Sequence, residues 1–243
     1  MVSDVRLSVA APCFNEAEAI EAVLVEWDGV LDAMPGTSEI VLCNDGSTDA
    51  TAEVLERMVQ RFPRLRVVSF ETNAGYGRAL RSAIGATTGR YVATIDSDGQ
   101  FDLAEASELI EELERGGFDC VTGYRKGKND SFFRVLADRG FNRLVRLMFG
   151  VRLRDTNCAL KVAKGDVLRE LHIEARGYPT PTEIVLRLDA RGCRIGEVGI
   201  THRERAAGAS KLHPWRTAWT MFRYLLYLRR KLKLFRAGII VES

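Results

Sequence analysis

The sequence has no pair of cysteines at C-x-x-C spacing, although it contains five cysteines in all. They are widely scattered along the chain, at Cys13, Cys43, Cys120, Cys158 and Cys193. This spacing excludes a structural zinc site or a redox centre of the C-x-x-C kind. The hydrophobic fraction of 46% and the charged fraction of 28% also exclude disordered, collagen-like and disulfide-scaffold chains. We expect the cysteines to be small buried side chains in a reducing compartment.

Long apolar runs are missing as well. No stretch of about eighteen apolar residues occurs, so we expect no membrane-spanning helix. The first residues lack the charged region, apolar run and cleavage site of a secretory signal, and we expect no export. The formal net charge of +2 is too small to indicate a nucleic-acid binder. Linkers, repeats and low-complexity segments are absent too, so 243 residues predict one large domain and a tail.

Short apolar segments alternate with segments of helical periodicity over the first half of the chain. This β-α-β order predicts an α/β fold: a mostly parallel, Rossmann-like sheet with helices on both faces and ligands at the carboxyl ends of the strands. The expected strands are residues 7–11, 39–43, 66–70, 91–95 and 120–123, and the helices between them are residues 16–34, 50–61, 75–87 and 103–115. Further along we expect a basic loop at 125–129, helices at 132–149 and 182–190, a short segment at 160–162 and a strand at 193–200.

Two carboxylates one residue apart follow the expected strand at 91–95, in the segment D-S-D-G-Q. Alternate residues at a strand end point the same way. Asp96 and Asp98 can therefore hold one Mg²⁺ or Mn²⁺ while a diphosphate supplies further oxygen ligands, and Gln100 offers another oxygen. A solvated turn would account for the same tripeptide, but its place directly after a buried strand favours a metal site.

Polar segments also follow the first and second expected strands. In N-D-G-S-T-D-x-T, Asp45 can accept hydrogen bonds from the ring NH of uracil or guanine, while the residues after it cap the next helix. In P-x-x-N-E, Pro12 ends the strand, and Glu16 can reach a nucleoside hydroxyl or complement the helix dipole. Taken singly, each segment is also explained by ordinary turn or cap chemistry.

These segments occur in one order after successive strands: P-x-x-N-E, N-D-G-S-T-D-x-T, N-x-G-Y-G-x-A and D-S-D-G-Q. In this order they resemble the family 2 inverting glycosyltransferases of GT-A fold, and within them the dolichyl-phosphate mannose synthase and polyprenyl-phosphate glycosyltransferase branch. The resemblance runs from about residue 7 to residue 211 and implies a GT-A catalytic domain.

The resemblance also implies roles for individual residues. Asp96, Asp98 and Gln100 would hold the metal, with Asp98 at the centre of catalysis. Gly75 and Gly77 would let the backbone approach the nucleotide closely. The implied nucleotide-sugar site consists of Pro12, Asn15, Glu16, Asp45, Gly75 and Asp96.

The acceptor side is implied by residues after the fifth expected strand. In the resembled branch, arginines at the positions of Arg125 and Arg139 face the acceptor phosphate, which suits the forked donors of a guanidinium. A solvated basic loop is the alternative, and we prefer it for Lys126 and Lys128. The segment that begins at Asp155, D-T-N-C, is similar to the family segment that flanks the acceptor.

The basic segment at residues 203–211 is similar to the R-x-x-G-x-S-K stretch of the family. There Arg205, Ser210 and Lys211 would hold the donor diphosphate and neutralise charge as the nucleotide leaves. Without the upstream segments it would be interpreted as a mobile basic loop.

The tail that we expect over residues 212–243, after a catalytic domain at 1–211, is basic and amphipathic. Residues 203–236 contain ten Lys and Arg against the single acid Glu204. Aromatic and leucine side chains recur there at helical spacing, at Trp215, Trp219, Phe222, Leu225, Leu226 and Leu232. Such a helix suits the headgroup region of an anionic membrane. Alternatively it packs on the catalytic domain, or on a second subunit to form a homodimer.

The expected activity is transfer of a sugar, with inversion, from a UDP- or GDP-sugar to a polyprenyl phosphate, with Mg²⁺ or Mn²⁺ as cofactor. An acceptor phosphate is ionised near neutral pH, since its second pKa is about 6, and needs little help from a base. An alternative acceptor is a hydroxyl of a soluble glycan or small molecule, which requires a base, and Asp155 is the candidate. A non-catalytic nucleotide-binding scaffold is a third interpretation.

We expect a cytoplasmic protein that is peripheral on the cytoplasmic face of a membrane. The resemblance leaves the choice between uracil and guanine open, because Asn44 stands where many relatives have an Asp.

Overall fold

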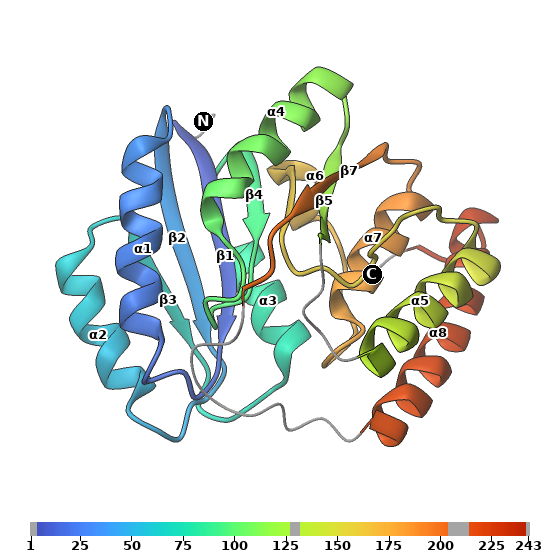
Figure 1. The fold of residues 1–243 in the computed structure, drawn as a ribbon, viewed down its shortest axis with the longest axis horizontal. Coiled ribbons are helices and arrows are strands. Elements are labelled where there is room, and N and C mark those ends of the chain that lie inside the picture. The colour runs from blue at the N-terminus through green and yellow to red at the C-terminus, as the bar shows by residue number, and fades with distance from the viewer. Residues whose placement is uncertain (1–3, 127–131, 204–213, 242–243) are drawn as a thin grey trace.

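The computed structural model describes residues 4–126, 132–203 and 214–241, which form one seven-stranded sheet with helices around it (Figure 1). The strands are β1 (Val5–Cys13), β2 (Thr37–Asn44), β3 (Leu65–Ser69), β4 (Tyr91–Thr94), β5 (Cys120–Arg125), β6 (Lys161–Lys164) and β7 (Ile195–Ile200). The helices are α1 (Ile20–Ala33), α2 (Thr51–Arg61), α3 (Tyr76–Gly85), α4 (Ala106–Gly116), α5 (Phe132–Phe149), α6 (Gly165–Arg169), α7 (Thr180–Ala190) and α8 (Pro214–Arg236), with a 3₁₀ turn at Leu103–Glu105.

The strand order is β3-β2-β1-β4-β6-β5-β7. Every neighbouring pair is parallel except the two that involve β6, which runs antiparallel between β4 and β5. The carboxyl ends of the six parallel strands therefore meet at one edge of the sheet. The predicted α/β class with a mostly parallel sheet is confirmed.

The two faces of the sheet are apolar because side chains alternate along each strand. On β1, Leu7, Val9 and Ala11 belong to the core under α1, α2 and α4, whereas Ala10 belongs to the core under α3, α6 and α7. Both sets are buried, and each large aliphatic side chain buried in this way stabilises the fold by about 1.5–3 kcal/mol.

Helix α8, which lies within the expected tail, packs on α5 and α7. Its buried residues Met221, Leu225, Leu228 and Leu232 recur at helical spacing, and the last three form a core cluster with α5 and α7. In Figure 1 α5 and α8 lie side by side, beyond α7. One face of α8 thus packs on other helices of the chain, which is one of the alternatives expected for the tail. None of the helices in the described parts of the chain has the length and apolar character needed to cross a membrane.

Several boundaries differ from the expected ones. Arg125 is the last residue of β5 rather than the start of a basic loop, because its backbone continues the parallel ladder with Ile200 of β7. Helix α1 begins at Ile20 instead of residue 16, although the carbonyl oxygen of Glu16 already accepts the N–H of Ile20 at 2.9 Å. The short segment at 160–162 is the antiparallel strand β6, and the five-residue helix α6 was not expected.

The cysteines are all free, and four of them are buried. Burial raises the pKa of these four thiols to about 12, at Cys13, Cys43, Cys120 and Cys158. Thiols with this pKa stay protonated near neutral pH and behave as small apolar groups. The prediction of small buried side chains is confirmed for these four, whereas Cys193 is only partly buried.

Candidate active site

Two cavities lie at the edge of the sheet where the parallel strands end. The first cavity has a volume of about 400 Å³ and is lined by Pro12, Cys13, Phe14, Glu16, Asp45, Asn73, Gly75, Tyr76, Asp96, Ser97, Asp98, Arg176 and Gly177. The second cavity, of about 280 Å³, is lined by Tyr76, Asp96, Gln100, Phe101, Arg125, Asn157, Ala159, Tyr178, Pro181 and His202. Tyr76 and Asp96 line both, so the two cavities adjoin at these side chains.

The loops after β1 and β2 are held together by hydrogen bonds between their polar residues. Asn15 has a positive φ of 54°, and its amide oxygen accepts the N–H of Thr48 at 2.8 Å. The N–H of Asn15 is bonded to Ser47 Oγ at 3.0 Å. Asp49 accepts the N–H of Thr51 at 3.0 Å at the start of α2, and the N-cap position itself is taken by Ala50. These polar motif residues thus bond to one another and hold the loops that form the wall of the first cavity. Asn15 itself does not line that cavity.

Asp45 is nearly fully buried and holds the loop that precedes α3. Its carboxylate accepts the N–H of Ala74 at 2.7 Å, the N–H of Gly75 at 3.0 Å and the Nδ2–H of Asn73 at 3.0 Å. A carboxylate has about four acceptor positions. Three of these acceptor positions are therefore occupied by donors within the protein. A nucleotide base could bond only to the position that remains.

The glycines of this loop allow a close approach to the backbone of another loop. A Cβ at Gly77 would lie 1.7 Å from the carbonyl oxygen of Ala175, and one at Gly75 would lie 2.4 Å from that of Arg176. Gly75 also has a φ of 97°, which few other residues adopt. The close approach is to the backbone of residues 175–176, although Gly75 does line the first cavity as predicted.

The D-S-D-G-Q segment follows β4 and presents its carboxylates to the cavities. Ser97 donates to the carbonyl oxygen of Pro12 at 2.8 Å and is buried. Asp98 accepts the N–H of Gln100 at 3.1 Å, and Asp96 accepts the phenol of Tyr76 at 2.7 Å. Burial and the Asp96 charge raise the pKa of Tyr76 well above its ordinary value of 10. The phenol therefore remains a hydrogen-bond donor at neutral pH.

A divalent cation fits the donors of this segment. Asp96 and Asp98 both line the first cavity, and Gln100 lines the second with Asp96. Within the described ranges no group of three or more His, Cys, Asp or Glu side chains could hold a metal ion. Mg²⁺ is commonly bound through one or two carboxylates together with substrate phosphates and waters, so two carboxylates beside an open cavity suit a metal that arrives with a diphosphate.

Arg125, at the end of β5, is fixed by two carboxylates. Its Nε donates to Asp155 Oδ2 at 2.7 Å and its Nη2 to Oδ1 at 3.3 Å. Asp138 of α5 lies 3.5 Å from the same Nη2. Although burial opposes it, the bonds and charges of these partners raise the pKa of Arg125 above its ordinary range, so the guanidinium in the second cavity stays charged.

The other two residues expected on the acceptor side lie elsewhere. Asp155 is buried behind Arg125 and lines neither cavity. Arg139 is exposed on α5, next to Asp138, and also lines neither cavity. Arg205, Ser210 and Lys211, expected at the diphosphate, lie outside the described residues.

The lining residues that had not been singled out from the sequence include Tyr76, Arg176, Tyr178 and His202. Tyr76 stands inside the N-x-G-Y-G-x-A motif, so attention to its polar side chain could have found it. His202 lies two residues after β7 and its ring meets that of Phe101 edge-on at 5.0 Å. Arg176 and Tyr178 have no motif around them, and only the fold brings them to the cavities.

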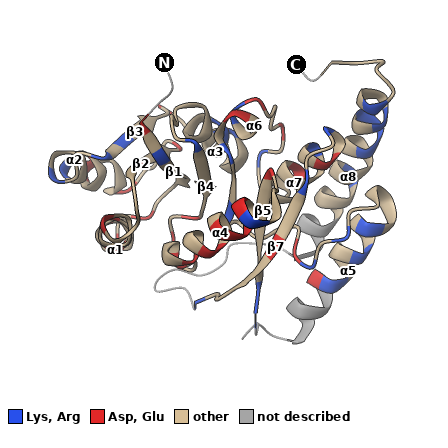
Figure 2. Ribbon diagram, turned by 90° about the horizontal axis from the view of Figure 1, so that it is seen from above, with Lys and Arg blue, Asp and Glu red and all other residues tan. Residues whose placement is uncertain are grey.

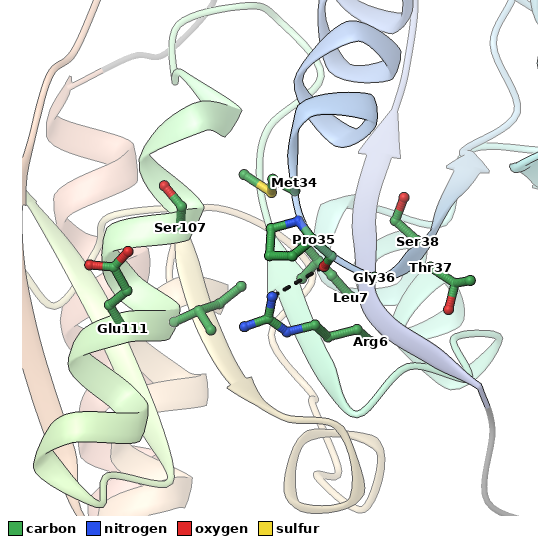
Figure 3. Close-up of a pocket in the computed structure, with 10 residues that line it drawn as sticks. Arg6, Leu7, Met34, Pro35, Gly36, Thr37, Ser38, Ser107 and Glu111 are labelled. Atoms are coloured by element: carbon green, nitrogen blue, oxygen red, sulfur yellow. Dashed lines mark hydrogen bonds between the residues drawn. The ribbon is translucent and has the colours of Figure 1, made fainter.

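A smaller cavity of about 70 Å³ lies at the opposite end of the sheet, between the start of β1 and α4 (Figure 3). There Arg6 donates to the carbonyl oxygen of Pro35 at 3.1 Å. In sheets of this kind ligands bind at the carboxyl ends of the strands. The position and small size of this cavity therefore argue against a substrate site.

Residues 8–159 match glycosyl transferase family 2. Because this is more than half of the chain, the protein belongs to that family, and the predicted resemblance and enzyme class, a glycosyltransferase, are confirmed. The chain is similar to dodecaprenyl-phosphate galacturonate synthase of Rhizobium johnstonii, with 31% identity over 93% of the chain. It is also 33% identical, over 84% of the chain, to undecaprenyl-phosphate 4-deoxy-4-formamido-L-arabinose transferase of Edwardsiella ictaluri. The chain spans 66% and 62% of the length of these two relatives.

Solved structures show the same fold. Glucosyl-3-phosphoglycerate synthase of Mycobacterium tuberculosis, in complex with phosphoglyceric acid, matches with a TM-score of 0.70 and 24% identity, over 98% of this chain and 81% of that one. A structure of that enzyme with Mn²⁺ and UDP-glucose matches with a TM-score of 0.68 and 25% identity, over 98% and 80%. The predicted GT-A fold is confirmed by this likeness.

Proposed function

We propose that this protein transfers a sugar from a nucleotide diphosphate donor to the phosphate of a polyprenyl phosphate, with inversion at the anomeric carbon. The observation that carries the proposal is the pair of adjoining cavities: one contains the carboxylates of Asp96 and Asp98, and the other contains the guanidinium of Arg125. A donor in the first cavity and an acceptor in the second would meet at Tyr76 and Asp96. The relatives named for polyprenyl-phosphate substrates support the acceptor class.

The donor is proposed to occupy the first cavity. Glu16 and Asp45 would stand at the nucleoside end and Asp96 and Asp98 at the diphosphate end, with Gln100 in the adjoining second cavity. Mg²⁺ or Mn²⁺ bound there would neutralise the diphosphate and stabilise it as the leaving group, and the complexes of the Mycobacterium enzyme with Mn²⁺ and UDP-glucose support this choice.

The acceptor phosphate is proposed to bind the positive charge of Arg125 through Nη1, because Nε and Nη2 donate to Asp155 and Asp138. One of its oxygens attacks the anomeric carbon, the bond from this carbon to the diphosphate oxygen breaks, and the electron pair leaves with the nucleotide. Asp155 accepts two hydrogen bonds from Arg125 and lines neither cavity. We therefore assign it to positioning Arg125, and no general base is needed because the phosphate is already ionised.

The outer face of α8 is proposed to contact a membrane. Trp219, Leu226 and Tyr227 are exposed large side chains there, and the exposed basic residues around them are Arg223, Arg229, Arg230, Lys233 and Arg236. Figure 2 shows the concentration of basic residues along α8 and the neighbouring α5. Such a face suits anionic headgroups. Since all five thiols are free, we place the protein on the cytoplasmic side, where thiols remain reduced.

The test is turnover of a panel of UDP- and GDP-sugars with Mg²⁺ or Mn²⁺, offering either a short polyprenyl phosphate or soluble hydroxyl acceptors. We expect transfer to the polyprenyl phosphate only, and loss of that transfer in Asp98→Asn. The matched control is Asp32→Asn on α1, an exposed carboxylate far from both cavities. Transfer to a hydroxyl acceptor alone would refute the proposed acceptor, and undiminished turnover by Asp98→Asn would refute the proposed metal site.

A further inference from the structure

The connection between α6 and α7 lines both cavities. Arg176 and Gly177 belong to the wall of the first cavity and Tyr178 to the wall of the second. No sequence motif accounts for this segment. Because this segment lines the same cavity as Asp96 and Asp98, its side chains can contact a substrate bound there.

A buried glutamate holds the backbone of this segment. Glu183, in the first turn of α7, is fully buried and accepts the N–H of Glu174 at 3.0 Å and that of Ala175 at 2.7 Å. The carboxylate is paired with Arg187 Nε at 2.6 Å. From the same turn, the hydroxyl of Thr180 donates to the carbonyl oxygen of Gly177 at 2.7 Å. Residues 174–177 are therefore fixed at both ends.

The other side of the segment is confined by the loop before α3. Gly75 and Gly77 leave no room for a Cβ against the carbonyl oxygens of residues 175 and 176. The side chain of Arg176 is exposed while its backbone is packed. Arg176 thus lines the first cavity from a backbone that is held in place.

Arg176 is also unusual in its charge environment. Among the described residues that line the first cavity it is the one cation, and the other charged residues there are Glu16, Asp45, Asp96 and Asp98. Over the described parts of the chain, no carboxylate oxygen lies within 4 Å of its guanidinium nitrogens. An arginine presented at a cavity without an internal acid partner is available to an anion from outside, and its planar fork matches the two oxygens of a phosphate or a carboxylate.

We propose that Arg176 binds an anionic group of the donor, either the diphosphate or a carboxylate on the sugar, and so determines which donors are accepted. This inference rests on the proposed donor site. It adds a residue from outside the family motifs to that site and gives the segment 174–178 a role in specificity.

The experiment is calorimetric binding to the full chain with Mg²⁺, comparing wild type with Arg176→Gln, Arg176→Lys and the control Arg57→Gln. Arg57 is exposed on α2 and lines neither cavity. The probes are UDP and GDP, uridine and guanosine, and the pair UDP-glucose and UDP-glucuronate. If the diphosphate is the partner, Arg176→Gln weakens binding of the nucleoside diphosphate by about ten- to a hundredfold and leaves the nucleoside unchanged.

If a sugar carboxylate is the partner, Arg176→Gln weakens UDP-glucuronate by a similar factor while UDP and UDP-glucose keep their affinity. In either case Arg176→Lys retains part of the affinity, because it keeps the charge and loses the fork. Equal affinities of Arg176→Gln and wild type for every probe would overturn the inference and leave the proposed function standing. Failure of the wild-type protein to bind any of these nucleotides would overturn the proposed donor, and the inference with it.

Discussion

The phenol of Tyr76 donates a hydrogen bond of 2.7 Å to Asp96 Oδ1, and both side chains line both cavities. Tyr76 is the first residue of α3, whereas Asp96 follows β4, so the bond ties a helix start to the carboxylate loop. A carboxylate that binds a metal ion must keep one orientation. Tyr76 is placed to impose that orientation on Asp96.

Replacement of Tyr76 by Phe should therefore reduce activity without unfolding the protein. A hydrogen bond to a charged group contributes about 1.5–3 kcal/mol, so we expect kcat/KM to fall by about ten- to a hundredfold. Binding of Mn²⁺ in the presence of UDP should weaken as well. Steady-state kinetics and metal titration measure the two effects.

Tyr91→Phe is the matched control, because its phenol also donates to a carboxylate, that of Glu114 at 2.9 Å, but at the start of β4. We expect this variant to bind Mn²⁺ and turn over as wild type does. If Tyr76→Phe also left both quantities unchanged, Tyr76 would have no part in positioning Asp96.

The parts of the site that could be predicted from the sequence are those whose geometry is local. Asp96 and Asp98 could be placed on one wall because they follow β4 within a few residues, and parallel strands bring their carboxyl ends to one edge. Arg176 could not be found in this way, since it reaches the first cavity only through the packing of residues 175–176 against Gly75 and Gly77.

The fold shows the same division. The β-α-β alternation predicted the parallel strands, but four-residue β6 takes its place between β4 and β5 through pairing with distant strands, which no local pattern encodes. The role of Asp155 was also open from sequence, because whether a carboxylate acts as a base or holds an arginine depends on which side chain lies beside it.

Asp155→Asn should raise the KM for the polyprenyl phosphate and change kcat little. The two donors of Arg125 bond to two different oxygens of Asp155, and in Asn one of these is replaced by an NH2 donor. Arg125 therefore loses its fixed orientation while Asp138, 3.5 Å away, still balances its charge. We expect about a tenfold rise in KM, in line with one weakened charged hydrogen bond. The pH profile of kcat should stay that of wild type; loss of the acidic limb, where activity rises as a carboxylate ionises, would instead identify Asp155 as a general base.

Lys231→Met on α8 should weaken nucleotide binding although it lies outside both cavities. Lys231 and Tyr227 hold the Glu174 carboxylate, and Glu174 begins the segment that carries Arg176. A looser segment would present the guanidinium less favourably, and we expect a drop in UDP affinity of roughly threefold to tenfold, measured by calorimetry. Lys233→Met, an exposed lysine on the same helix, is the control. Equal affinities in the two variants would show that α8 does not influence the first cavity.

Glu39 on β2 predicts a pH dependence of stability that is separate from catalysis. It is 8% exposed and accepts hydrogen bonds from Ser8 Oγ at 2.6 Å and from the N–H and Oγ1 of Thr88 at 2.6 and 2.9 Å. Arg66 lies 2.7 Å away. Burial favours the neutral acid, but the hydrogen bonds and the Arg66 charge outweigh it and lower the pKa of Glu39 below its ordinary value of 4.5.

Because the pKa of Glu39 is lower in the folded chain, its ionised form stabilises the fold fully above about pH 4.5, and this contribution is lost as the pH falls through the folded-state pKa. Glu39→Gln should lower the free energy of unfolding by about 1–3 kcal/mol at pH 7, and the difference from wild type should shrink below about pH 4.5. Urea unfolding between pH 7 and pH 3 measures it. Glu56→Gln, an exposed residue of α2, should stay within about 0.5 kcal/mol of wild type throughout. A Glu39→Gln deficit of the same size at pH 3 and pH 7 would mean that the charge of Glu39 does not contribute to stability.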